Sequence, residues 1–170
     1  MPEPKQQDAI ALLKEDHRTV EDLFTQFEKA TGDGRKQKLA QQICLELSVH
    51  AAIEEEIFYP ACEGKVEEDL IKEAYVEHDG AKVLIAEIAG NTQASDDFFD
   101  AKVKVLQEEI EHHVEEEEQA GGVFSQARKG KIDLDSLGDQ LAARKKELTA
   151  SYKASGVPQP ELTTMDEVSV

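Results

Sequence analysis

Apolar residues recur at alternating steps of three and four along four long stretches of this chain. That spacing is typical of one face of an α-helix and differs from the strict alternation of a half-buried strand. Residues that break helices separate the stretches, among them Gly32, Pro60, Gly90 and Gly130. The pattern predicts helices over residues 6–30, 36–60, 66–89, 97–120 and 134–153.

Four amphipathic helices of about 20 to 25 residues joined by short loops favour an up-down-up-down four-helix bundle. The fold class is therefore predicted as all-α, with an additional C-terminal helix that packs across the outside of the bundle. Asp96 or Asp97 is expected to cap the fourth helix, and Asp133 the fifth. Residues 1–153 form the predicted domain. Residues 154–170 contain two prolines and no periodicity, which predicts a flexible tail.

Each of the four bundle helices carries one histidine in its apolar stripe: His17, His50, His78 and His113. Each lies about 12 to 16 residues from the same end of an antiparallel bundle. At a rise of about 1.5 Å per residue, these heights agree to within roughly one helical turn. The four imidazoles are therefore predicted to meet at one level of the core.

Two glutamates join them, because Glu54 follows His50 by four residues and Glu117 follows His113 by four. Ionised carboxylates in an apolar core cost several kcal/mol each unless a cation compensates them. Imidazole nitrogen together with carboxylate oxygen suits iron, manganese or zinc, and six ligands exceed the four of a structural zinc site. The residues thus predict a pair of metal ions; no catalytic residue is assigned. The predicted ligands are His17, His50, Glu54, His78, His113 and Glu117.

Several neighbouring residues remain alternatives or bystanders. His112 could act as the ligand in place of His113, and Tyr59 or Tyr75 could supply a phenolate. Cys44 and Cys62 are too few for a disulfide framework and are expected to pack as small hydrophobes. The other acids beside the ligands are expected to lie on solvated helix faces: Glu55, Glu56, and the run 115–118 apart from Glu117.

Charge and composition exclude several classes of partner. The formal net charge of −18 opposes binding to nucleic acid or to an anionic membrane surface. No stretch approaches the roughly 20 apolar residues of a membrane span, and the N-terminus has no basic segment followed by an apolar run. A cytoplasmic location is expected.

The segments around the predicted ligands resemble the haemerythrin-like, or HHE cation-binding, family. The matching motifs are LLKEDHRTVEDLF around His17, HAAIEEEIFYP from His50, EHDGAKVLIAEI around His78 and HHVEEEEQAGGVF around His113. The resemblance covers residues 8 to 128. It implies a four-helix bundle with two non-haem iron ions bridged by oxo or hydroxo oxygen, held by the six residues named above.

The chain departs from the oxygen-carrying members that it resembles. They have a second histidine four residues from the first on the third helix, whereas Ala74 and Lys82 stand there in this chain. One iron would therefore be more open, which favours oxidation chemistry or a water ligand. The first functional hypothesis is binding or sensing of O2, NO, peroxide or iron, with a signal passed to a protein partner through the C-terminal helix or tail. The alternatives are peroxidase, catalase-like or ferroxidase activity, and a structural metal site.

Overall fold

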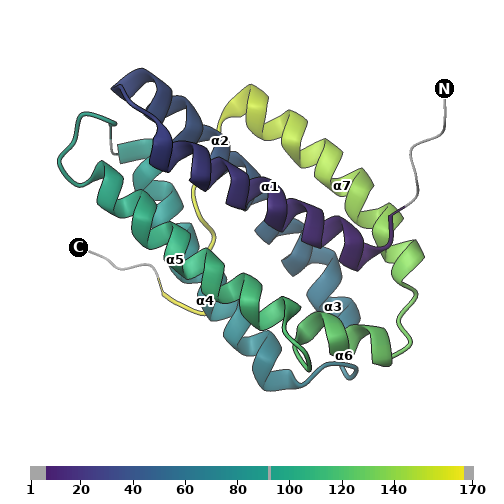
Figure 1. The fold of residues 1–170 in the computed structure, drawn as a ribbon. Helices are drawn as coiled ribbons and strands as arrows, with labels where there is room; N and C mark the ends of the chain where they lie inside the picture. Colours follow the sequence, from purple (N-terminus) through teal and green to yellow (C-terminus); the bar gives the residue numbers. More distant parts are fainter. Residues whose placement is uncertain (1–6, 92, 167–170) are drawn as a thin grey trace.

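The computed structural model describes residues 7–91 and 93–166, which form four long helical runs and a further C-terminal helix (Figure 1). The first run is α1 (Ala9–Lys29). The second is continuous through α2 (Asp33–Ile53), a π-helical turn η1 (Glu54–Phe58) and α3 (Tyr59–Cys62). The third joins α4 (Glu68–Ala86) to η2 (Glu87–Asn91), and the fourth is α5 (Phe99–Glu118). The short α6 (Val123–Lys129) and the long α7 (Leu134–Ser155) follow.

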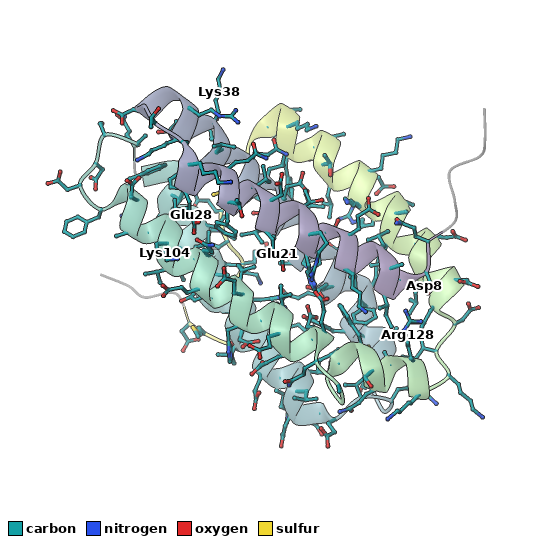
Figure 2. All side chains as sticks on the ribbon, viewed as in Figure 1. Asp8, Glu21, Glu28, Lys38, Lys104 and Arg128 are labelled. Atoms are coloured by element: carbon teal, nitrogen blue, oxygen red, sulfur yellow. The ribbon has the colours of Figure 1, made fainter. Side chains whose placement is uncertain are left out.

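The four runs close into a ring in chain order. α1 packs on α2, α2 on α4, α4 on α5, and α5 on α1, which confirms the up-down-up-down bundle. α7 lies along α1 and α2 on the outside, as predicted (Figure 1). Charged pairs lie on the surface of the ring, where Lys104 of α5 approaches Glu28 of α1 to 3.7 Å (Figure 2).

Aspartates begin several of the helices. The carboxylate of Asp8 accepts a hydrogen bond from the amide of Ala11, which caps α1, and Asp133 caps α7 through the amide of Ser136. Asp96 accepts from the amide of Phe98 before α5, but the N-cap of α5 is Phe98 and no side chain caps it, so the predicted cap at Asp96 or Asp97 was wrong. The predicted cap at Asp133 is therefore confirmed. The predicted start of the first helix at residue 6 lies outside the described residues.

Several predicted helix ends were wrong: the second helix, for example, begins at Asp33 and not at residue 36. Pro60 was expected to end the second helix, but the run continues to Cys62. The turn before it is a widened π-turn, and Pro60 sits in the first turn of α3, where a residue without an amide hydrogen is tolerated. The fourth helix was expected to extend to residue 120, but it ends at Glu118, and the separate helix α6 carries Phe124.

The apolar core consists of two clusters with a polar layer between them. Leu13, Ile53 and Ala74 belong to one cluster, which also includes residues of α6 and α7. Val20 and Ala81 belong to the other. These residues flank the predicted ligands on their own helices, so the ligands lie where the two clusters meet.

The segment after α7 has no helix up to Asp166. It nevertheless lies against α4: the amides of Thr163, Thr164 and Met165 all donate hydrogen bonds to the carboxylate of Asp79. Residues 167–170 of the predicted flexible tail lie outside the described residues. Within the described ranges, none of the helices combines the length and apolarity that a membrane span needs.

Candidate metal centre

The six predicted ligands come together in the polar layer between the two apolar clusters. They form two groups, and within each group the potential ligand atoms all lie within 4.8 Å of one another. All six side chains are buried, none of them more than 8 % exposed. One group contains His17, His50 and Glu117, and the other contains Glu54, His78 and His113.

Imidazoles from different helices lie ring to ring, as the predicted common height requires. The ring centroids of His17 and His50 are 4.9 Å apart, and those of His78 and His113 are 4.7 Å apart. Phe124 of α6 stacks on the His17 ring at 5.7 Å with an interplanar angle of 13°. The packing of α6 thus holds one ligand in place from outside the four bundle helices.

Glu54 lies between the two groups. Its Oε1 is 3.0 Å from Nε2 of His50, 3.3 Å from Nε2 of His78 and 3.9 Å from Nε2 of His113. Glu117 also lies between the two groups. Its Oε1 is 3.3 Å from Nε2 of His17 and 3.2 Å from Nε2 of His113. Each carboxylate therefore faces imidazoles of both groups.

Several of these buried atoms have no hydrogen-bond partner among the described residues, even though they lie close to one another. They are Nε2 of His17 and His50, both carboxylate oxygens of Glu54, and Oε1 of Glu117. Buried polar atoms are almost always paired, so a cluster of unpaired ones needs an explanation. A cation bound among them would satisfy all of them, and imidazole with carboxylate is a donor set that suits iron. The residues therefore fit a metal centre.

A second layer of carboxylates holds the imidazoles from behind. In every case Nε2 faces the centre while Nδ1 meets a carboxylate oxygen 2.7 to 3.0 Å away. Such contacts select the tautomer that leaves Nε2 available to a metal. The pairs are His17 with Glu118, His50 with Asp16, His78 with Glu55, and His113 with Glu77.

Sequence reasoning missed this second layer and wrongly assigned Glu55 and Glu118 to solvated faces. Their side chains are only 13 % and 21 % exposed. The available signal was adjacency, because each orienting acid is the chain neighbour of a ligand: Asp16 precedes His17, and Glu77 precedes His78. The acid orients an imidazole on another helix, so helical periodicity within one segment could not reveal the contact.

The charges of the centre are strongly coupled. Burial lowers the pKa of His50, but the charge of Glu54 and the hydrogen bonds with Asp16 and Glu54 outweigh burial and raise that pKa to about 10. Burial likewise lowers the pKa of His113, yet Glu117 and its other carboxylate neighbours hold it well above its usual value. Burial raises the pKa of Glu54, but the charge of His50 and the surrounding imidazoles hold it well below the usual range. Without metal, protons on His50 and His113 therefore balance the buried carboxylates around them, and a cation must displace those protons.

Tyr59 is a further polar side chain at the centre. Its hydroxyl donates to Oε2 of Glu117 at 3.0 Å and lies 3.3 Å from Nε2 of both His78 and His113. Burial, followed by the negative charge of Glu117, raises the pKa of Tyr59 well above its usual value. Removing that proton to form a phenolate would therefore require a cation at the same place.

The π-turn explains why sequence spacing did not point to Tyr59. In a regular α-helix, five residues rotate a side chain by about 500°, so Tyr59 would lie about 140° from the direction of Glu54. Here the amide of Tyr59 bonds the carbonyl of Glu54, five residues earlier, and the wider turn reduces that angle. Tyr75, the other candidate phenolate, packs edge-on against the Tyr59 ring.

The remaining candidates lie away from the centre. His112 is 64 % exposed and contacts Glu77 and Glu116, so the structure brings His113 and not His112 to the core. Cys44 and Cys62 are buried and unpaired, and burial raises the pKa of both thiols to about 12.

Comparison with known proteins agrees with this geometry. The chain is similar to the crystal structure of a hemerythrin HHE cation binding domain-containing protein from Mycobacterium kansasii. The TM-score is 0.76, the identity is 24 %, and the match covers 88 % of this chain and 94 % of the other. A DNA nickase of Nostoc sp. is 30 % identical over 107 residues, which is 63 % of this chain but only 30 % of the nickase. This chain thus spans less than a third of that relative's length.

The family model described as the Hemerythrin HHE cation binding domain matches residues 8–120, a span that holds all six predicted ligands and all four orienting carboxylates. The chain therefore belongs to the hemerythrin HHE cation-binding domain family.

Proposed function

We propose that the buried centre binds two iron ions and that this di-iron centre binds a small oxygen or nitrogen ligand: O2, NO or peroxide. The cluster of buried ligand atoms without hydrogen-bond partners carries the proposal. In this assignment each of the two groups would hold one ion, and Glu54 and Glu117, which face imidazoles of both groups, would be shared between the ions. Oxo or hydroxo oxygen would complete the bridge.

The donor set favours iron over a purely structural ion. Six protein donors exceed the four that a structural zinc site uses, and divided between two ions they leave coordination positions for an exogenous ligand. When bound, the iron would supply those positions and its redox chemistry. The protein's part is to hold each imidazole by its Nδ1 carboxylate and to exclude bulk water with the two apolar clusters.

A catalytic role in peroxide disproportionation is the second candidate, and Tyr59 favours it. Its hydroxyl oxygen lies 3.0 Å from Oε2 of Glu117 inside the centre. The hydroxyl proton is therefore close to where a reacting oxygen ligand would need a proton. Steady release of O2 from peroxide by the iron-loaded protein, with a strong loss in Tyr59→Phe, would establish this activity. Turnover no faster than that of free iron would exclude it.

We do not extend the nickase activity to this chain. Binding to DNA phosphate depends on clustered basic residues, whereas this chain carries a formal net charge of −18. The two buried, unpaired cysteines fit the cytoplasmic location that we propose.

Metal analysis with a matched pair of variants tests the di-iron proposal. His112 and His113 are chain neighbours, but His112 is exposed and His113 is buried in the centre. We expect about two iron ions per chain in the wild type and in His112→Ala, and at least half of the iron lost in His113→Ala. The absorption spectrum of the oxidised wild type should change on adding azide or NO.

Three results would contradict the proposal. His113→Ala could keep all its iron, the metal-free protein could stay empty when iron is returned, or the purified protein could hold about one zinc and no iron. The last result would favour a structural site.

A further inference from the structure

A cavity of about 510 Å³ opens beside the candidate metal centre. The four imidazoles of the centre contribute to its lining. The rest of its wall is largely apolar and includes Leu47, Ile85, Ala86 and Ile110. The cavity therefore connects the metal-binding layer with the apolar cluster next to it.

The size of this cavity does not match a diatomic ligand or peroxide. Such a molecule would occupy only a small part of it, whereas pockets for organic molecules have volumes of roughly 300 to 1,000 Å³. Substitution of a few small residues could have filled the space, since Ala51, Ala81 and Ala86 all border it. Space of this kind in an otherwise close-packed interior suggests a larger occupant.

The C-terminal segment forms one wall of the cavity. Residues 157–163 all border it, and Val157 packs against the apolar cluster around Phe99. The segment is held at its far end, where the buried carboxylate of Asp79 accepts hydrogen bonds from three successive amides and from the Thr164 hydroxyl. The Thr163 hydroxyl donates to Glu55, the acid that orients His78.

Most of the charged side chains around the cavity already have partners. Lys82, the only lysine among the lining residues, donates to Glu55 and to the carbonyl of Glu161. Four of the lining carboxylates also have partners: Asp16 with His50, Glu46 with Gln42, Glu55 with His78, and Glu56 with Arg144. An anionic ligand would find Lys82, the lysine among the described lining residues, already paired, and the acidic surface would repel it.

From these observations we infer that the cavity is a binding site for a mainly apolar organic molecule without negative charge, and that residues 157–163 form part of that site. The molecule lies beside the imidazoles of the metal centre, in contact with the apolar side chains of α2, α4 and α5. Its binding depends on the shape of the cavity and not on the reaction of the metal, so this inference goes beyond the proposed function.

Titration with 1-aminoanthracene, a neutral fluorescent aromatic amine, tests the inference on the full chain as purified. We expect a saturable rise in emission at one molecule per chain. Ala86→Phe fills the cavity and should weaken binding by at least about tenfold. Ala101→Phe makes the same change at an exposed position of α5 and should leave the affinity unchanged. The iron content should be the same in both variants.

A second variant guards against misfolding of Ala86→Phe. Val157 lies in the non-helical segment, so Val157→Asp places a charge in the cavity wall without disturbing a helix, and it too should weaken binding. The anionic probe 8-anilinonaphthalene-1-sulfonate should bind more weakly than 1-aminoanthracene. Absence of saturable emission, equal affinity in the wild type and both cavity variants, or tighter binding of the anionic probe would overturn the inference.

Discussion

Raising the pH should destabilise the metal-free protein, and His50 sets the scale of the effect. Its pKa is 6.5 in an unfolded chain and about 10 in the folded protein, because Glu54 and Asp16 outweigh the effect of burial. A raised pKa stabilises the fold fully below pH 6.5, and this stabilisation is lost as pH rises toward 10. At about 1.4 kcal/mol per pH unit, the complete effect is on the order of 5 kcal/mol. From pH 6.5 to 8.5, His50 alone should remove about 2 kcal/mol from the free energy of unfolding.

The free energy of unfolding of the iron-loaded protein should instead rise between pH 6.5 and 8.5. A metal binds neutral imidazole, so protons compete with it, and its apparent affinity rises with pH. Urea unfolding followed by circular dichroism at pH 6.5, 7.5 and 8.5 measures both trends, on chelator-treated protein and on iron-loaded protein freed of excess metal. His112→Ala provides the control. Because His112 is exposed, its loss should leave the pH dependence of the unfolding free energy unchanged in both the metal-free and the iron-loaded protein. A metal-free protein whose stability stays constant or rises from pH 6.5 to 8.5 would refute the coupling between His50 and its carboxylates.

Other substitutions test the centre and the core separately. Tyr59→Phe should keep the iron but change its visible absorption, whereas Tyr75→Phe, one ring farther out, should change neither. Asp16→Asn removes the charge behind His50 and should weaken iron binding by about 10- to 100-fold, measured by competition with a chelator. Leu13→Ala should lower the unfolding free energy by about 2 to 5 kcal/mol because Leu13 is fully buried. Val105→Ala, on the exposed face of α5, should change that free energy by less than about 0.5 kcal/mol.

The bundle could be predicted from the sequence because its helices are long and each has one continuous apolar stripe. Helical spacing identified the four bundle runs and the C-terminal helix, and short loops left neighbouring helices antiparallel. The ends of the second and fourth helices were predicted wrongly because the local sequence there does not follow the usual pattern. Pro60 follows a π-turn, which residue propensities do not predict. Phe124 continues the apolar spacing of α5, although it lies in the separate helix α6.

The meeting of the six candidate ligands could be predicted because each lies in the apolar stripe of its own helix, where a polar residue stands out. The orienting carboxylates could not be predicted in this way. Glu55 and Glu118 lie at the edge of a stripe, and they become buried only because an imidazole of another helix approaches them. Their role depends on packing between helices, which the periodicity of one helix does not report.

The C-terminal segment shows a different reason for incomplete prediction. Residues 157–166 have no periodicity, and in isolation they would have little reason to order. Their position depends on Asp79, a buried acid of α4 whose carboxylate is satisfied by the amides of Thr163 to Met165. The requirement to pair a buried carboxylate thus explains where this segment lies against α4, which composition alone does not predict.

The same requirement explains how one arrangement of side chains can hold either protons or metal. In the metal-free protein, protonated His50 and His113 neutralise the buried Glu54 and Glu117, which is why the pKa values of these imidazoles rise. A cation at the centre takes over that task and releases the protons, while the outer carboxylates keep each ring in the same orientation. Metal binding should therefore release protons near neutral pH without rearranging the helices. The charges that attract the metal would thus also hold the imidazoles in place before it arrives.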